Sequence, residues 1–461
     1  MGSTKSKPAP PADGVWNAKA TYSVLDDEEV PPTAEAVVAA RAMAAAAVGG
    51  GGVEGGDVEL ERAVAVLMGA AVGDALGAPL EFAPLQYGKT FVRGLDDEEV
   101  WRTPGYNRFS LQPGQWTDDT SMALCLADSL LVCGRLDARD VRRRFGMWWT
   151  NGLNTSFGFS PLTADHGRRA VGLGGNVGAS LREFEENNSM YTQAGNYATS
   201  GNGSIMRNAP IPIFFHNTPD AALDAAWAQS KTTHRGDEAG DAARLLTHIT
   251  LAAISRASEP AYATMGEWLD GSGVLDGFEA YTYSVGRLAR GLAEEAHPSN
   301  SHLDLADREW TWRDAEFRYC ARRAKSQPGY IGSYAMDCLA MALHCVHSTA
   351  SFEAALLKVA NLRGDADSVG AVVGQLAGAF YGLAAIPPSW IEAVQRYDRG
   401  GDIATKAVLL YTHSYDGSTP SDPPPVAPSL REEPATSGTG ESTSQATATD
   451  ADSSGSSIAA Q

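Results

Sequence analysis

Two acidic turns are the part of this sequence best suited to chemistry, and each leads straight into an apolar stretch. Residues 117–120 read Thr-Asp-Asp-Thr, and residues 364–368 read Gly-Asp-Ala-Asp-Ser. Four carboxylates gathered at helix starts would repel one another strongly in a protein interior unless divalent cations shared them. Two such ions would balance the four charges, and the hydroxyls of Thr117 and Ser368 would add oxygen donors. Because neither turn holds Cys or His, the donor set favours Mg²⁺ or Mn²⁺ over zinc.

Each turn taken alone has a simpler explanation as the start of a helix. Thr117 or Asp118 would cap the helix, with acidic residues in its first turn, an arrangement that the helix dipole favours. The alternating Asp365 and Asp367 also faintly suggest a calcium loop, but residues 369–371, Val-Gly-Ala, supply none of the further ligands of an EF-hand. The metal interpretation therefore needs support from the rest of the sequence.

The elements that must position these turns are helices. Apolar residues recur at helical spacing in one segment after another, whereas alternating β-branched runs are nearly absent. The pattern predicts an all-α fold, with a single compact multi-helix domain over residues 57–416 that is large enough for a buried core. Helical segments are predicted at residues 60–76, 122–133, 141–149, 221–230, 239–255, 278–293, 337–347, 352–361, 369–384 and 403–411.

Both ends of the chain have the composition of disordered tails. Residues 1–56 are rich in Ala, Pro and Gly and lack a period that could build a core, although residues 34–48 are Ala-rich enough to form a transient helix. Residues 417–461 consist mostly of Ser, Thr, Pro, Ala, Gly and acidic residues. We therefore predict a disordered leader over 1–56 and a disordered acidic tail over 417–461.

One predicted helix carries a stripe of glycines. Gly370, Gly374 and Gly378 are four residues apart, so they form a smooth face that lets another helix approach closely. A tightly packed central helix would hold Asp365 and Asp367 rigidly, as a catalytic metal pair requires.

Charge and cysteine content narrow the class of partner. The chain carries 36 Lys and Arg against 56 Asp and Glu, a formal net charge of -20, and no basic face interleaved with aromatic residues, which argues against nucleic-acid binding. Its five cysteines have no metal-binding or disulfide spacing, so we expect reduced thiols in a cytoplasmic protein. We expect a monomer.

The N-terminal residues, Met-Gly-Ser-Thr-Lys-Ser, fit the N-myristoylation pattern and resemble the acylated start of Src-type kinases. In a eukaryotic source Gly2 would be the acylated residue; the alternative is an unmodified tail. One acyl chain gives only marginal membrane binding, and the acidic residues 26–29 oppose anionic lipid. At most we expect weak, reversible membrane contact and partial membrane association.

Five sequence blocks together resemble the ADP-ribosylglycohydrolase family. They are residues 69–82 (Gly-Ala-Ala-Val-Gly-Asp-Ala-Leu-Gly-Ala-Pro-Leu-Glu-Phe), 116–124, 201–207 (Gly-Asn-Gly-Ser-Ile-Met-Arg), 233–234 (Thr-His) and 364–370. Their order and spacing are similar to those of the family over about residues 59–415. The resemblance implies an all-α hydrolase with two Mg²⁺ or Mn²⁺ ions. Its reaction would be hydrolysis of the bond joining ADP-ribose to a protein side chain or a small acceptor.

The resemblance also implies roles for individual residues. Six positions match the metal ligands: Thr117, Asp118, Asp119, Asp365, Asp367 and Ser368. Glu81 matches a glutamate on a mobile loop over the site, and Asp74 is expected to order a loop or a water beside the metals. We expect Glu81, Asp119 and Asp365 to be catalytic, with one of the four aspartates acting as the base and Glu81 or Asp119 handling the leaving group's proton. Serine at position 368 slightly favours ADP-ribosyl-arginine over ADP-ribosyl-serine.

Two further blocks are expected to hold the substrate. The turn of Gly201, Asn202, Gly203 and Ser204 would offer backbone N–H groups to the diphosphate, although a plain type I' turn is the alternative. His234 would contact the ribose or a phosphate, unless it is only a helix-cap residue. The loop of Gly332, Ser333 and Tyr334 would border the ligand, with Tyr334 stacked on adenine.

Two other functions stay open on the sequence alone. The first is a catalytically silent ADP-ribose-binding or crystallin-like protein, since the family that the chain resembles has a lens-crystallin branch. The second is another metal-dependent phosphohydrolase that uses the same pair of ions.

Overall fold

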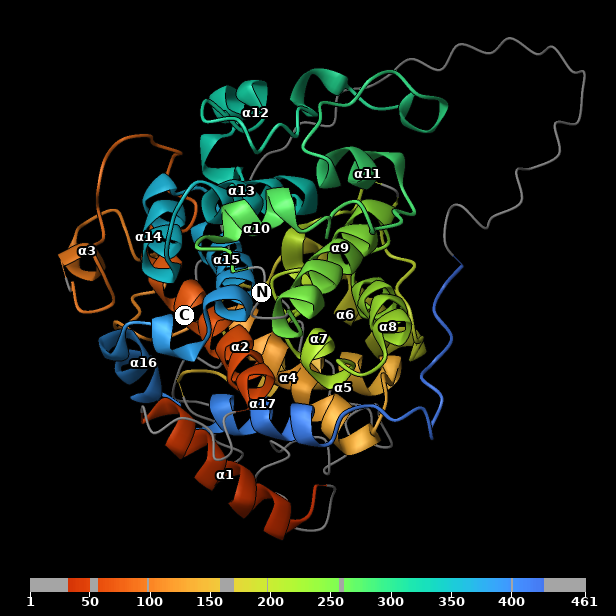
Figure 1. The fold of residues 1–461 in the computed structure, drawn as a ribbon. Helices are drawn as coiled ribbons and strands as arrows, with labels where there is room; N and C mark the ends of the chain where they lie inside the picture. Colours follow the sequence, from red (N-terminus) through yellow and green to blue (C-terminus); the bar gives the residue numbers. More distant parts are fainter. Residues whose placement is uncertain are drawn as a thin grey trace, which may run out of the picture.

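A central antiparallel pair of helices organises the protein: α2 (Val58–Gly77) and α15 (Ala366–Tyr381) (Figure 1). The computed structural model describes residues 32–49, 57–97, 99–157, 170–196, 198–256, 261–398 and 401–426. These residues form helices and isolated β-bridges, with no strand among them. The predicted all-α, single-domain fold is therefore confirmed.

The other helices surround this pair. The longer ones are α1 (Ala34–Val48), α4 (Asp118–Cys133), α5 (Ala138–Asn151), α6 (Gly175–Asn187), α8 (Pro219–Lys231), α9 (Asp237–Ile254), α13 (Ala335–His347), α14 (Phe352–Leu362), α16 (Pro388–Gln395) and α17 (Asp402–Thr412). The short ones are α3 (Glu99–Arg102), α7 (Pro210–Phe214), α10 (Met265–Gly271), α11 (Tyr283–Ala289) and α12 (Ala321–Ser326). α2 is long and apolar enough to cross a membrane, yet it is enclosed by its neighbours as a core helix is.

The glycine stripe explains how closely the two central helices pack. A Cβ atom at Gly374 would lie 1.9 Å from the carbonyl oxygen of Gly69, and one at Gly370 would lie 2.4 Å from that of Gly73. At Gly378 the carbonyl oxygen of Ala65 would be 2.2 Å away. No side chain fits at such distances, so α2 and α15 touch backbone to backbone, as the spacing of the glycines predicts.

Two segments that flank the predicted domain contact it in the structure. Ala34–Val48 is a helix that packs on α17 and buries Ala40, Ala44 and Ala47 (Figure 1). Part of the predicted tail is also held, because Asp422 accepts a hydrogen bond from the backbone N of Ala138 (2.9 Å). Residues 34–48 thus form a helix on the domain and residues 417–426 include a contact with it, although the sequence analysis assigned both segments to the tails. Residues 1–31, with the candidate acylation site Gly2, and residues 427–461 lie outside the described part of the chain.

Two of the predicted helical segments run well past the ends of the observed helices. α11 covers only Tyr283–Ala289 rather than 278–293, because Thr282 caps its start and Gly291 adopts a positive φ just past its end. α15 ends at Tyr381 rather than 384, since Gly382 (φ 78°) turns the backbone out of the helix.

Candidate metal centre and substrate cavity

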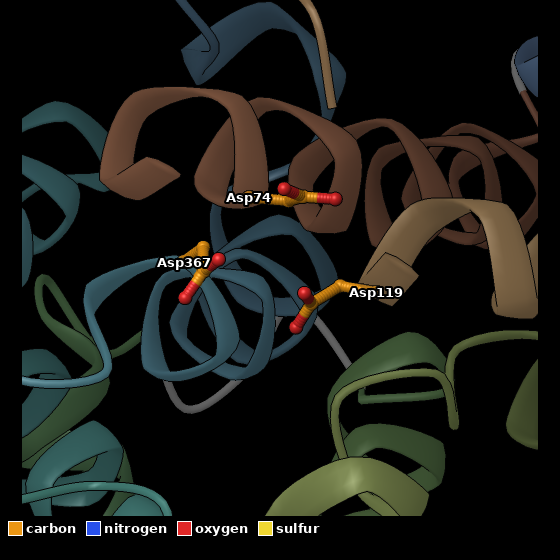
Figure 2. A group of neighbouring side chains, drawn as sticks. All are labelled: Asp74, Asp119 and Asp367. Carbon is orange, nitrogen blue, oxygen red and sulfur yellow. The ribbon is translucent and has the colours of Figure 1, made fainter. Parts of the chain in front are cut away.

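Carboxylates from three helices converge beside the central pair. Asp74 near the end of α2, Asp119 at the start of α4 and Asp367 at the start of α15 are buried (Figure 2). One oxygen from each lies within 4.8 Å of the others. Glu81, Asp365 and Asp367 form a second group with the same closeness. Because Asp367 belongs to both groups, the geometry suits two cations that share one ligand.

Asp74 holds the start of α4 in place. Its carboxylate accepts hydrogen bonds from the backbone N and Oγ1 of Thr117 (3.0 and 2.8 Å) and from the same two groups of Thr120 (3.0 and 2.6 Å). Burial raises the pKa of Asp74 to about 6, against the effect of these bonds. Asp74 thus orders the loop that carries Thr117 and Asp119.

The two acidic turns do not act as ordinary helix caps. Neither Thr117 at the start of α4 nor Asp365 at the start of α15 makes a side-chain capping hydrogen bond. Instead the Thr117 hydroxyl lies 2.9 Å from an oxygen of Asp119 and 3.5 Å from one of Asp367. The other Asp119 oxygen is buried and has no hydrogen-bond partner. An unpartnered buried carboxylate oxygen is costly, and a cation would satisfy it.

Without cations, the negative charges of the carboxylates in this cluster are unfavourable. Burial, and then neighbouring carboxylates, hold the pKa values of Asp118, Asp119 and Asp367 well above their usual range. Burial and Asp365 raise the pKa of Glu81 to about 8. At neutral pH, these groups must therefore either carry protons or share cations.

We predict that the melting temperature of the metal-free protein falls as the pH rises from 5 to 8. A carboxyl with a raised pKa binds its proton more tightly in the folded state. The stability it contributes is therefore lost between the unfolded pKa, 4.5 for Glu81, and the folded one, about 8. We expect a drop of about 5 °C or more in chelator. Mg²⁺ should reverse most of it at pH 8 and little at pH 5, where protons compete. Thermal scans with EDTA or Mg²⁺ measure this, and a melting temperature that rises with pH would contradict it.

A cavity of about 260 Å³ opens onto these carboxylates. Its lining includes ten of the predicted site residues: Glu81, Asp118, Gly201, Asn202, Gly203, His234, Ser333, Asp365, Asp367 and Ser368. Asp118 belongs to neither carboxylate group; a Cβ at Gly172 would lie 1.8 Å from its Oδ1. The Ser368 hydroxyl donates to Sδ of Met206 (3.6 Å). The cavity thus gathers most of what the sequence analysis singled out.

The lining also contains residues that the sequence analysis missed. Phe82 and Tyr330 form an aromatic pair with ring centres 4.9 Å apart. Gly172, Gly174, Gly175, Asn176 and Val177 form another part of the wall, with Met206 nearby. The closely spaced glycines were the available signal for this loop, whereas nothing in the local pattern marks Tyr330.

Part of the predicted substrate turn faces elsewhere. Residues 202–204 form a short 3₁₀ turn rather than a type I' turn, and the backbone N of Asn202 already donates to Ser333 (2.9 Å). Its side-chain Nδ2 donates to Asp365 (3.0 Å) and to the carbonyl of Gly332 (2.9 Å). Ser204 is fully buried and accepts a hydrogen bond from Ser230 (2.9 Å). In this structure the backbone N–H of Asn202 is thus already paired and Ser204 does not line the cavity, so their roles in substrate binding stay predictions.

Tyr334 does not line the metal cavity, and Glu81 does. Tyr334 lines a second cavity of about 610 Å³, where Arg308 donates to its hydroxyl (3.3 Å), so the ring that faces the metal cavity is Tyr330. Gly332 does not line the metal cavity, but its φ of 98° sets the turn between the two tyrosines. The segment after Glu81 is held here, because Phe82 N donates to the Gly364 carbonyl (2.7 Å) and Gly364 N to that of Ala83 (3.0 Å).

The protein is thus an all-helical domain with buried carboxylates at the adjoining ends of its central helices, beside a cavity lined in part by glycines. Comparison with known proteins gives the family. A model of the ADP-ribosylglycohydrolase family matches residues 56–417. The chain therefore belongs to the ADP-ribosylglycohydrolase family, and it is a hydrolase that acts on glycosyl bonds of ADP-ribose.

Individual relatives agree with this assignment. The chain is 30% identical to the ADP-ribosylarginine hydrolase Tri1 of Pseudomonas putida, over 76% of this chain and 82% of that protein. It is 26% identical to the ADP-ribosyl-[dinitrogen reductase] glycohydrolase of Rhodospirillum rubrum, over 72% and 89%. A solved structure described as an ADP-ribosylglycohydrolase-related protein complex matches with a TM-score of 0.55 and 29% identity, covering 77% of this chain and 99% of that one.

Proposed function

We propose that the protein uses two Mg²⁺ or Mn²⁺ ions to remove ADP-ribose from arginine side chains of modified proteins. The observation that carries the proposal is the pair of carboxylate groups that share Asp367 at the base of the cavity. Every donor in the two groups is an oxygen, which suits hard cations. The residues that would hold the ions are Asp119, Asp365 and Asp367, with oxygens of Thr117, Asp118 and Ser368 beside them. When bound, such ions supply positive charge that polarises the ribose at the scissile bond.

The chain's own residues divide the remaining work. In the metal-free protein, burial and Asp365 raise the pKa of Glu81 to about 8, so Glu81 is the residue that we propose as proton donor to the leaving group. The base that accepts a proton from an attacking water would be one of the four aspartates of the two turns, Asp118, Asp119, Asp365 or Asp367. Asn202 orients Asp365 through its Nδ2 hydrogen bond.

Arginine as the acceptor is supported from two sides. The most similar relatives described above include an ADP-ribosylarginine hydrolase. Beside Glu81, the rings of Phe82 and Tyr330 form an aromatic wall of the cavity. A carboxyl group next to aromatic faces is chemically suited to a guanidinium, which stacks on rings and donates to oxygen. A cytoplasmic location, a monomeric state and acylation of Gly2 stay predictions.

The test is a release assay on two matched peptides. The protein is incubated with ADP-ribosyl-arginine and ADP-ribosyl-serine peptides, in Mg²⁺ or in EDTA, and free ADP-ribose and phosphate are measured. We expect Mg²⁺-dependent ADP-ribose release, faster from the arginine peptide, with no phosphate. ADP-ribose release at the same rate in EDTA as in Mg²⁺ would overturn the metal proposal. Binding without release would indicate a silent ADP-ribose-binding protein, and phosphate release from nucleotides would indicate a phosphohydrolase.

A further inference from the structure

The ring of His234 packs under the turn that the sequence analysis assigned to the diphosphate. A Cβ added at Gly203 would lie 3.0 Å from Cε1 and 3.2 Å from Nε2 of this ring, and one added at Gly201 would lie 3.4 Å from Nε2. The ring therefore fills the space that side chains at these positions would need. His234 is 1% exposed and lines the metal cavity, so its Nε2 edge is the edge directed at the Gly201–Gly203 turn.

The other ring nitrogen of His234 has a single partner among the hydrogen bonds of the described residues. Nδ1 lies 2.8 Å from Oγ1 of Thr233. The same hydroxyl lies 2.7 Å from Nη2 of Arg207. A guanidinium donates hydrogen bonds and never accepts them, so Arg207 occupies an acceptor site of the hydroxyl. The hydroxyl could accept a second hydrogen bond, but its own hydrogen also needs an acceptor, and among the described residues Nδ1 is the one acceptor that its hydrogen bonds provide. Nδ1 therefore carries the lone pair.

Burial and further hydrogen bonds hold the Arg207 side chain in this position. It is fully buried, and it donates to the carbonyl of Gly203 (2.8 Å) and to the side chain and carbonyl of Gln229 (3.1 and 3.0 Å). Its guanidinium lies 4.5 Å from the ring centre of Phe145. Burial lowers the pKa of Arg207 to about 9, so the group is still charged at neutral pH.

The charge state of His234 agrees with the same arrangement. Burial, and then the positive charges of Arg207 and Lys231, hold the pKa of His234 well below its usual value. A neutral imidazole carries one N–H, and its position is decided by what the other nitrogen accepts. If Nδ1 accepts from Thr233, the hydrogen is on Nε2.

We propose that Arg207 and Thr233 are positioning residues that fix His234 in the Nε2–H tautomer, so that His234 donates a hydrogen bond from Nε2 to an oxygen of the substrate's diphosphate. In this Arg207–Thr233–His234 relay, the charged Arg207 donates to Thr233 and Thr233 donates to Nδ1. The neutral ring of His234 then presents its Nε2–H at the cavity wall. The tautomer stands on the hydrogen bonds alone, whereas the contact with the diphosphate rests on the proposed function.

Nuclear magnetic resonance tests the tautomer directly. Two-bond ¹⁵N–¹H correlation spectra of the full chain, which has nine histidines, distinguish Nε2–H from Nδ1–H rings, and His234→Gln assigns the signal. We expect Nε2–H in the unmodified protein. Thr233→Val removes the hydroxyl and should shift His234 towards the Nδ1–H form, while Thr233→Ser should leave it unchanged.

Binding of ADP-ribose in Mg²⁺, measured by calorimetry, tests the contact. Loss of one aligned donor is expected to weaken ADP-ribose binding about tenfold in Thr233→Val. Thr233→Ser should bind as the unmodified protein does. Thr232→Val is the matched control, because the Thr232 hydroxyl also accepts from Arg207 (3.3 Å) but donates to the Gln229 carbonyl (2.6 Å) instead of to the histidine.

An Nδ1–H signal for His234 in the unmodified protein would overturn the proposal, and this result does not require any variant to fold. A shifted tautomer in Thr233→Val with unchanged affinity would overturn the contact with the diphosphate. Equal losses of affinity in Thr232→Val and Thr233→Val would show a general packing effect and overturn it as well. Should the protein bind ADP-ribose without hydrolysing it, the proposed hydrolase function would fail while these outcomes would still decide the relay.

Discussion

Replacing Asp365 and Asp367 together by asparagine is expected to lower kcat/KM for ADP-ribosyl-arginine by about a thousandfold or more. Asp367 contributes to both carboxylate groups and Asp365 to one, so the double change removes two of the five carboxylates that the two groups contain. Asparagine keeps the size of each side chain, and at position 365 it can still accept the bond from Asn202. We therefore expect calorimetry to show lost Mg²⁺ binding in a protein with an unchanged helical circular dichroism spectrum.

The same double variant should be more stable than the unmodified protein when both are metal-free at pH 8. Burial and surrounding carboxylates hold the pKa of Asp367 well above its usual range, which means that its charge opposes folding. Unfolding of the variant, or activity that survives, would contradict assignment of these residues as metal ligands.

Asp241 provides a matched control with the opposite expected sign. It is also buried, but it pairs with Arg244 (2.8 Å) and accepts from the backbone N of Thr282 (2.7 Å). Burial raises the pKa of Asp241 as well, but Asp241→Asn would leave the buried Arg244 guanidinium without its carboxylate partner, so the variant should lose about 3 kcal/mol of folding stability. Its activity per folded molecule should be unchanged.

The sequence predicts the core of the fold better than its margins, for a physical reason. Helical periodicity and the glycine stripe are local sequence patterns. The stripe predicts which face of α15 another backbone contacts. No such local pattern predicts that Ala34–Val48 packs on the domain. Its buried face on α17 consists of alanines, whose small apolar area does not differ in pattern from that of a flexible segment.

The same distinction applies to the candidate site, where some features follow from residue types and others depend on the folded backbone. Thr117 and Asp367 are 250 positions apart in the sequence. The two acidic turns could still be assigned to one metal site, because both turns carry carboxylates that need cations and both match the family. The directions of single loop side chains could not be predicted. Tyr330 and Tyr334 lie on either side of Gly332, and only its positive φ decides that the first faces the metal cavity and the second faces away.

Gly374→Ala is expected to destabilise the protein by about 3 kcal/mol or more, although alanine is the better helix former. The added methyl would lie 1.9 Å from the carbonyl oxygen of Gly69, and a backbone atom in a packed helix cannot move aside as a side chain would. The helices must separate, which opens gaps along the whole contact. Urea unfolding of the metal-free protein measures the loss.

Gly286→Ala in α11 is the matched control, since its Cβ would lie 3.5 Å from the Cβ of Ala280, an ordinary contact. It should stabilise the protein by up to about 1 kcal/mol through helix propensity. Equal stability of the two variants would contradict backbone contact between α2 and α15. These helices carry Asp74 and Asp367, so any folded Gly374→Ala protein should also bind Mg²⁺ more weakly. Gly286→Ala should bind it normally, because the spacing of α2 and α15 sets the distance between the carboxylates.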